Sequence, residues 1–105
     1  MSEDYFLKGT KALEKGNLTK AVSYLKRAGE FKEALLNLGT AYKKSGEVHK
    51  AIATYKKCID APFIDGSFGT YAAIHNNLGL CYYAIGDDMS ALAAYSAALD
   101  IDPSN

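Results

Sequence analysis

The chain has 105 residues, of which 49% are hydrophobic and 23% are charged, and its formal net charge at pH 7 is zero. This length accommodates one domain with a continuous core, and the composition excludes a disordered or proline-rich linker. No apolar run approaches the ~18 residues that a membrane span requires, so we expect a cytoplasmic protein without membrane contact.

The charges are distributed unevenly along the chain. All 12 Lys and Arg residues lie at or before Lys57, whereas residues 61–105 carry acidic groups and no basic one. Such a gradient arises by drift on exposed surfaces, or it serves an end-to-end contact between copies or a polarised partner. The sequence leaves these explanations open.

Six helices are expected, in three consecutive pairs. In chain order they cover about residues 3–15, 18–29, 32–45, 48–60, 69–85 and 88–100. A glycine that can adopt the left-handed conformation follows the first helix of each pair, at Gly16, Gly46 and Gly86.

The two joins between the pairs differ in length. Gly29 and Glu30 form a short join, whereas a longer one extends over about residues 61–67. Its Phe63 and Ile64, together with Phe68 at its end, are unusually apolar for a loop. We expect them to pack back onto the helices, with a small partner contact as the alternative.

One set of spacings, with intervals of 7, 5, 4 and 3 residues, recurs three times. Its members are Gly9, Gly16, Ala21, Leu25, Ala28; Gly39, Gly46, Ala51, Tyr55, Cys58; and Gly79, Gly86, Ala91, Tyr95, Ala98. The first glycine and the alanine remove bulk where two antiparallel helices cross closely, so Gly39 should face Ala51. The large fourth residue, such as Tyr55, should fill the space between neighbouring pairs.

These residues resemble the tetratricopeptide repeat pattern W-x2-L-G-x2-Y, A-x3-F, P. The second repeat matches it at Leu38, Gly39, Tyr42, Ala51, Tyr55 and Pro62. The third matches it at Leu78, Gly79, Tyr82, Ala91, Tyr95, Ala98 and Pro103, with His75 at the leading aromatic position. The first departs further, with Lys8 before Gly9 and Ala12 where the tyrosine would stand.

The resemblance implies an all-α fold, a superhelix of three antiparallel helical hairpins. It also implies a single domain over residues 1–105, with repeats at about 2–31, 32–71 and 72–105. Proteins of this kind are protein-interaction scaffolds, with co-chaperones among them, so we expect a protein or peptide partner and no catalysis.

In the family, the first helices of the hairpins line a concave groove that binds a peptide or a partner helix. The groove positions carried over to this chain are Phe6, Thr10, Leu36, Asn37, Thr40, Lys43, Asn76, Asn77, Leu80 and Tyr83. The alternative for these residues is packing between helices without a ligand.

The best-known groove of the family grips a peptide carboxylate with two lysines, two asparagines and an arginine. The positions of that clamp correspond here to Phe6, Thr10, Asn37, Ala73 and Asn77. Only Asn37 agrees, and charge-assisted hydrogen bonds make such recognition strong. A mainly apolar peptide or helix is therefore expected instead.

The last expected helix is apolar almost all round, where a surface helix should show a polar face. Solenoids generally need a polar cap at each end. Leu92, Tyr95 and Leu99 are therefore candidates for end stacking. The alternative function is assembly, in which the chain self-associates through this uncapped helix or forms part of a longer array.

No constellation for catalysis, a cofactor or a metal is found. His49 and His75 have no partner at a metal-ligand spacing, and Cys58 and Cys81 are expected to be reduced, packed thiols. The lysines at positions 43, 44, 56 and 57 are the nearest approach to a nucleic-acid patch. They fall on different helices of a neutral chain, so no nucleic-acid binding is expected.

Overall fold

A computed structural model describes residues 2–63 and 68–103 of the chain. Its helices are α1 (Ser2–Glu14), α2 (Leu18–Ala28), α3 (Lys32–Lys44), α4 (Val48–Asp60), α5 (Phe68–Ala84) and α6 (Asp88–Ile101). The described residues contain no strand. Each helix was expected from the sequence, and each end lies within one residue of its expected position.

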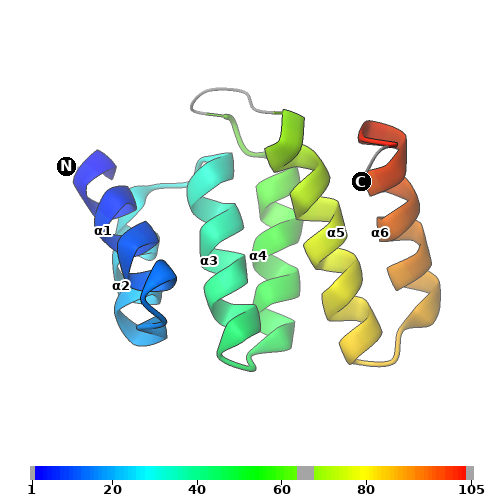
Figure 1. The fold of residues 1–105 in the computed structure, drawn as a ribbon, viewed down its shortest axis with the longest axis horizontal. Helices are drawn as coiled ribbons and strands as arrows, with labels where there is room; N and C mark the ends of the chain where they lie inside the picture. The colour runs from blue at the N-terminus through cyan, green and yellow to red at the C-terminus, as the bar shows by residue number, and fades with distance from the viewer. Residues whose placement is uncertain (1, 64–67, 104–105) are drawn as a thin grey trace.

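The helices form three antiparallel hairpins in a row, α1 with α2, α3 with α4, and α5 with α6 (Figure 1). Each first helix also contacts both helices of the hairpin before it, because α3 touches α1 and α2, and α5 touches α3 and α4. Among the described residues, α2 and α4 make no such contact with each other. The row therefore curves towards α1, α3 and α5, and the predicted all-α superhelix is confirmed.

The turn inside each hairpin is made by a glycine with positive φ. Gly16, Gly46 and Gly86 have φ of 81°, 86° and 80°. After Gly46, the N–H of Glu47 donates to the carbonyl of Tyr42 at 2.9 Å, and the other two turns repeat this bond. This is the arrangement in which a left-handed residue closes a helix end. The predicted positions of these helix ends are confirmed, and so is the role of the glycine in ending each helix.

The glycine in the first helix of each hairpin lies against the large residue of the second helix. A Cβ atom added to Gly39 would lie 2.6 Å from the ring of Tyr55, and one added to Gly79 would lie 2.8 Å from the ring of Tyr95. The expectation that the large residue fills the space between neighbouring hairpins therefore needs an addition, because its ring also covers the glycine of its own hairpin. A glycine leaves room for this ring, since any Cβ there would overlap it.

Lys32, at the start of α3, is buried and holds the end of α4. Its Nζ donates to the carbonyls of Cys58 at 3.0 Å and Ala61 at 2.8 Å, and also to that of Ile59. The last carbonyls of a helix have no partner within it, and a cation there satisfies them. Lys32 therefore acts as a side-chain cap across the hairpin.

The same lysine also fixes the start of the longer join. Its Nζ lies 5.0 Å from the ring centroid of Phe63 and 5.1 Å from that of Tyr71, between two aromatic faces. The two rings themselves meet edge to face at 6.4 Å. The expectation that Phe63 packs back onto the hairpins is confirmed, whereas Ile64 and the side chain of Phe68 lie outside the described part of the structure.

Candidate binding groove

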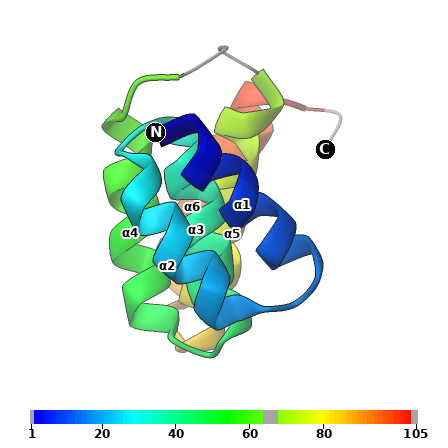
Figure 2. The same cartoon turned by 90° about the vertical axis from the view of Figure 1, so that its left-hand side faces the viewer.

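The side of the row formed by α1, α3 and α5 carries all the predicted groove residues, while α2 and α4 lie along the opposite side (Figure 2). Most of these residues are half-buried. Two at the end of α5 project further, since Leu80 is 43% and Tyr83 68% exposed. The groove is thus an open face with its most accessible apolar groups near the C-terminal hairpin.

Two side-chain hydrogen bonds connect neighbouring first helices across this face. The Nδ2 of Asn37 donates to the hydroxyl of Thr10 at 3.1 Å, joining α3 to α1. The Nζ of Lys43 donates to Oδ1 of Asn77 at 2.9 Å, joining α3 to α5. Four of the predicted residues are therefore brought together in pairs, and the amides are held in defined orientations.

Other predicted groove residues take part in packing. The hydroxyl of Thr40 donates to the carbonyl of Leu36 at 2.9 Å and lies 2.9 Å from the hydroxyl of Tyr55. Phe6 meets the ring of Phe31 edge to face at 5.3 Å. Leu36 and Phe6 also pack against the core. The packing alternative thus applies in part to these three residues, which support the face as well as line it.

Lys43 is the single cation among the predicted groove residues. Its amine donates to Asn77, which stands at one of the positions of the family's carboxylate clamp. At those positions stand an aromatic ring, a hydroxyl, a methyl group and two amides. The arrangement can hydrogen-bond a peptide backbone, since an amide side chain both donates and accepts.

The titratable groups beneath this face are packing groups. Burial lowers the pKa of His75, and the charge of Lys32 lowers it further. Burial raises the pKa of the Cys58 thiol to about 12 and also raises the pKa of Cys81. Protonated thiols are poor nucleophiles and poor metal ligands, so Cys58 and Cys81 act as packing groups. In the described part of the chain, no three metal-ligating side chains gather around a possible ion.

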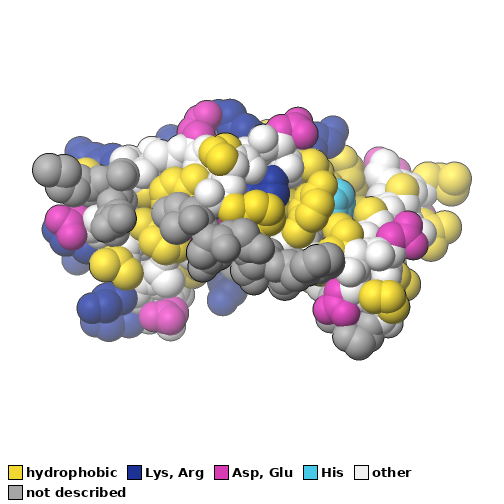
Figure 3. All heavy atoms as spheres, turned by 90° about the horizontal axis from the view of Figure 1, so that it is seen from above, with side chains coloured by type: hydrophobic (Ala, Val, Ile, Leu, Met, Phe, Trp, Pro, Cys, Tyr) yellow, Lys and Arg dark blue, Asp and Glu magenta, His cyan; other side chains and the backbone are white. Residues whose placement is uncertain are grey.

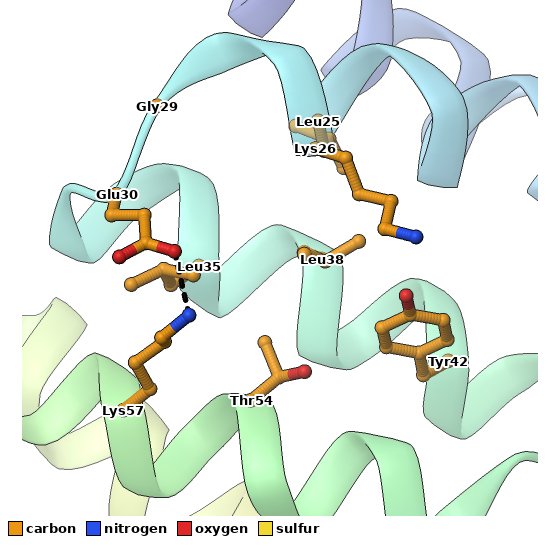
Figure 4. A pocket seen from close by; sticks show the side chains of 9 residues that line it. All are labelled: Leu25, Lys26, Gly29, Glu30, Leu35, Leu38, Tyr42, Thr54 and Lys57. Atoms are coloured by element: carbon orange, nitrogen blue, oxygen red, sulfur yellow. Dashed lines mark hydrogen bonds and ion pairs between the residues drawn. The ribbon is translucent and has the colours of Figure 1, made fainter.

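A recess on the opposite side of the array was not predicted from the sequence. It measures about 270 Å³ and lies between α2, α3 and α4 (Figure 4). Leu25, Leu38 and Tyr42 form its apolar wall, and an ion pair of 2.6 Å between Lys57 and Glu30 crosses its mouth. The recess results from the curvature of the row of hairpins. Because α1 contacts α3 on the inner side, α2 and α4 are apart on the outer side.

The predicted end-stacking residues lie on α6, the last helix of the row. Leu92 is 66% and Leu99 49% exposed, whereas Tyr95 is half-buried because one face of its ring covers Gly79. Met89, not singled out from the sequence, is also exposed. None of the described helices combines the length and hydropathy needed to cross a bilayer.

Comparison with known proteins agrees with this architecture. Family models described as tetratricopeptide repeat match residues 32–63 and 72–105. Among solved structures, the crystal structure of MamA is similar with a TM-score of 0.86 and 25% identity. The match covers 97% of this chain and 58% of the MamA chain. No curated protein shows a significant match. The repeat matches, the three hairpins and their glycine turns together show that this chain belongs to the tetratricopeptide repeat family.

Proposed function

We propose that the chain is a protein-interaction scaffold that binds a mainly apolar peptide or partner helix along the face of α1, α3 and α5. Tetratricopeptide repeats generally mediate protein–protein contacts and are typically non-enzymatic scaffolds. The observation that carries the proposal is the accessible pair Leu80 and Tyr83 beside the amides of Asn76 and Asn77.

The chemistry of this face favours an internal segment over a free carboxylate terminus. Exposed leucine and tyrosine side chains supply apolar contact area, and tyrosine adds a hydroxyl at its edge. The amides of Asn37 and Asn77 are oriented by Thr10 and Lys43, so a ligand meets them with little further ordering. The clamp positions carry no cation of their own, and the one groove lysine, Lys43, is already bonded to Asn77, so a terminal carboxylate would have to replace that bond to gain a charge-assisted contact.

A peptide array tests this proposal directly. Random 12-residue peptides are immobilised in two forms, with a free C-terminal carboxylate and with a C-terminal amide, and probed with the purified chain. Peptides rich in apolar and aromatic residues should be retained equally in both forms. Selective retention of the carboxylate form would contradict the proposed chemistry.

The double variant Asn77→Ala with Tyr83→Ala locates the binding face. It should lose most of the retained signal, because interface energy concentrates on a few central side chains. The matched control is Met89→Ala, which removes an equally exposed apolar side chain from α6. Circular dichroism should report the same helicity for all three proteins. Unchanged binding by the double variant would exclude this face as the site.

A further inference from the structure

The first hairpin contains a basic recess of about 300 Å³ between α1 and α2. Figure 2 is viewed from the end of the array that these two helices form. The cations that line the recess are the ammonium groups of Lys8, Lys11, Lys15 and Lys20. Asn17 and Tyr24 complete its polar lining, and no acidic residue takes part. We refer to these six residues as the lysine recess.

The lysines of the recess are exposed and have no carboxylate partner. In the described part of the chain none of them forms an ion pair, although Lys50 and Lys57 elsewhere pair with glutamates. Asp4 and Glu14 of α1 do not line the recess. Like charges that are held together raise the local electrostatic potential and attract an ion of opposite sign. The recess is therefore favourable for an anion.

Comparison with the other two repeats shows that the missing carboxylate is specific to the first hairpin. The repeats align in sequence with shifts of 30 and 40 residues, so Asn17 corresponds to Glu47 and Asp87. In the second repeat, Glu47 forms an ion pair of 3.1 Å with Lys50, the counterpart of Lys20. The first repeat thus has a neutral amide where the others have a carboxylate, and the charge of Lys20 is not neutralised.

The other three lysines of the recess also occur only in the first repeat. Their counterparts are Leu38, Ala41 and Ser45 in the second repeat and Leu78, Cys81 and Ile85 in the third. The first two positions are buried in those repeats, so exposure explains why the first repeat has polar residues there. Exposure does not explain why every one of these side chains is basic. The uniform sign of charge points to an anionic ligand.

The type of cation favours phosphoryl groups over carboxylates. All cations of the recess are lysines, whose ammonium groups act as point charges with three N–H donors each. The planar fork that matches a carboxylate belongs to arginine, and Arg27 lies instead over the ring of Tyr5 at 5.5 Å. A phosphoryl group carries a charge of about −1.5 to −2 at pH 7. Two neighbouring phosphoryl groups therefore balance the charge of the recess.

The remaining polar groups suit a compact ligand without a nucleobase. The Oδ1 of Asn17 accepts the backbone N–H of Lys20 at 3.3 Å, which leaves the amide N–H groups as donors. The ring of Tyr24 stacks with that of Tyr5 at 6.2 Å and lies 5.8 Å from Nζ of Lys8. These contacts occupy ring surface that a base would need for stacking. The recess thus offers donors for phosphoryl oxygens and little aromatic surface.

The charge distribution of the whole molecule disfavours an extended polyanion. Figure 3 shows Lys and Arg side chains at the end formed by α1 and α2, and acidic and apolar side chains at the opposite end. No Lys or Arg follows Lys57 in the sequence. A nucleic acid or an anionic membrane is bound through basic groups spread over a long surface. Lysines gathered in one recess match a small anion better.

We infer that the lysine recess binds a small anion with two neighbouring phosphoryl groups, of the pyrophosphate or bisphosphate class. The lysines and the amide of Asn17 donate to the phosphoryl oxygens. This site is separate from the predicted groove residues, so the chain can hold such an anion and a protein partner together.

Titration calorimetry of the full chain with pyrophosphate tests the site. In a buffer with about 0.15 M NaCl and no divalent cation, binding should saturate with a dissociation constant below about 1 mM. The anion should also raise the melting temperature, because it binds the folded chain. Citrate, a carboxylate anion, is the chemical control and should bind at least about tenfold more weakly.

The variant Asn17→Asp introduces the carboxylate of the other repeats with almost no change in shape. It should retain the helix cap, because Asp87 caps the backbone N–H of Ser90 at 3.2 Å in the third repeat. Binding of pyrophosphate should weaken at least about tenfold, since the added charge repels the anion and can pair with Lys20. Circular dichroism should report an unchanged helicity and no loss of melting temperature.

A matched pair of double variants separates the recess from surface charge in general. Lys11→Gln with Lys15→Gln removes two charges from the recess and should weaken binding at least about tenfold. Lys26→Gln with Lys44→Gln removes two exposed charges outside it and should bind pyrophosphate normally. The groove variant Asn77→Ala with Tyr83→Ala should also bind it normally, which keeps this inference distinct from the proposed groove.

Several results would overturn the inference. Absence of saturable binding, or equal binding by Asn17→Asp, would exclude the recess as an anion site. Citrate that binds as tightly as pyrophosphate would contradict the preference for phosphoryl groups. Tighter binding to a short single-stranded DNA, or to phosphatidylcholine vesicles containing phosphatidylserine, would identify a polyanion as the ligand if Lys11→Gln with Lys15→Gln abolished it.

Discussion

The two ends of the array are built from the same repeat, yet they meet solvent differently. At the N-terminal end, α1 exposes Asp4, Lys8 and Lys11 at the positions where α3 and α5 are apolar. At the C-terminal end, α6 exposes Leu92 and Leu99. The first hairpin is therefore closed to a preceding repeat, and the last is open to a following helix.

Cation–π contacts add to the closure of the N-terminal hairpin. The Nζ of Lys8 lies 5.8 Å from the ring of Tyr24, and the guanidinium of Arg27 lies 5.5 Å from the ring of Tyr5. The two rings stack at 6.2 Å. Long basic side chains thus cover aromatic surface while their charges stay in water. The last hairpin has no Lys or Arg of its own, and the cations over its rings come from the middle hairpin, Lys32 over Tyr71 and Lys56 over Tyr82.

The largest expected difference between the middle and the last hairpin is in the loss of stability when Tyr55 or Tyr95 is replaced by alanine. Tyr55 is fully buried, and Tyr55→Ala should lower the free energy of unfolding by about 3–5 kcal/mol. Tyr95 has the same contact with its glycine but lacks a neighbour on its other face, so Tyr95→Ala should cost roughly 2 kcal/mol. Urea denaturation followed by circular dichroism measures both. Equal losses would mean that the last hairpin is as well covered as the middle one.

The aliphatic positions one turn earlier should show a similar contrast. Ile52→Ala removes buried side-chain atoms under α5 and should cost about 2–4 kcal/mol. Its counterpart Leu92→Ala should change stability by no more than about 0.5 kcal/mol, because that side chain is largely in water. Thermal melts of the two variants at one concentration provide the measurement. A large loss for Leu92→Ala would show that α6 is already covered in solution.

Lys32 distinguishes the middle hairpin from the last one, where Ala72 stands at the equivalent position. Lys32→Met keeps the aliphatic stem but leaves the carbonyls at the end of α4 without their donor, at an expected cost of about 2–4 kcal/mol. Hydrogen exchange should then rise most near the end of α4. Lys57→Met, which removes an exposed ion pair with Glu30, is the control and should cost no more than about 1 kcal/mol.

The smallest expected effect is a loss of stability at acidic pH, which comes from His75 in the C-terminal hairpin. His75 stands where the middle hairpin has Leu35, and burial lowers its pKa from the ordinary 6.5. The unfolded chain therefore binds more protons than the folded one just below pH 6.5, so stability should fall as the pH drops through this window. His75→Leu should flatten the fall between about pH 7.5 and 5.5 in urea titrations. A slope equal to that of the unaltered chain would contradict this assignment.

The groove could be anticipated only in part. The resemblance assigned its predicted residues to α1, α3 and α5, because a helical repeat fixes which positions share a face. It did not show that Asn37 bonds to Thr10 or Lys43 to Asn77, since these distances depend on how closely neighbouring hairpins approach. The resemblance also did not distinguish packed from accessible groove residues. Thr40 hydrogen-bonds with Tyr55, whereas Tyr83 is exposed.

The sequence by itself determined the six helices, their glycine turns and the three-hairpin order, because these follow from local backbone preferences and from spacings within one repeat. The tertiary structure decided which side chains meet across a crossing, and it placed the rings of Tyr55 and Tyr95 against glycines. It also decided that Lys32 caps α4. Such features depend on atoms that are far apart in the chain, and no local spacing encodes those distances.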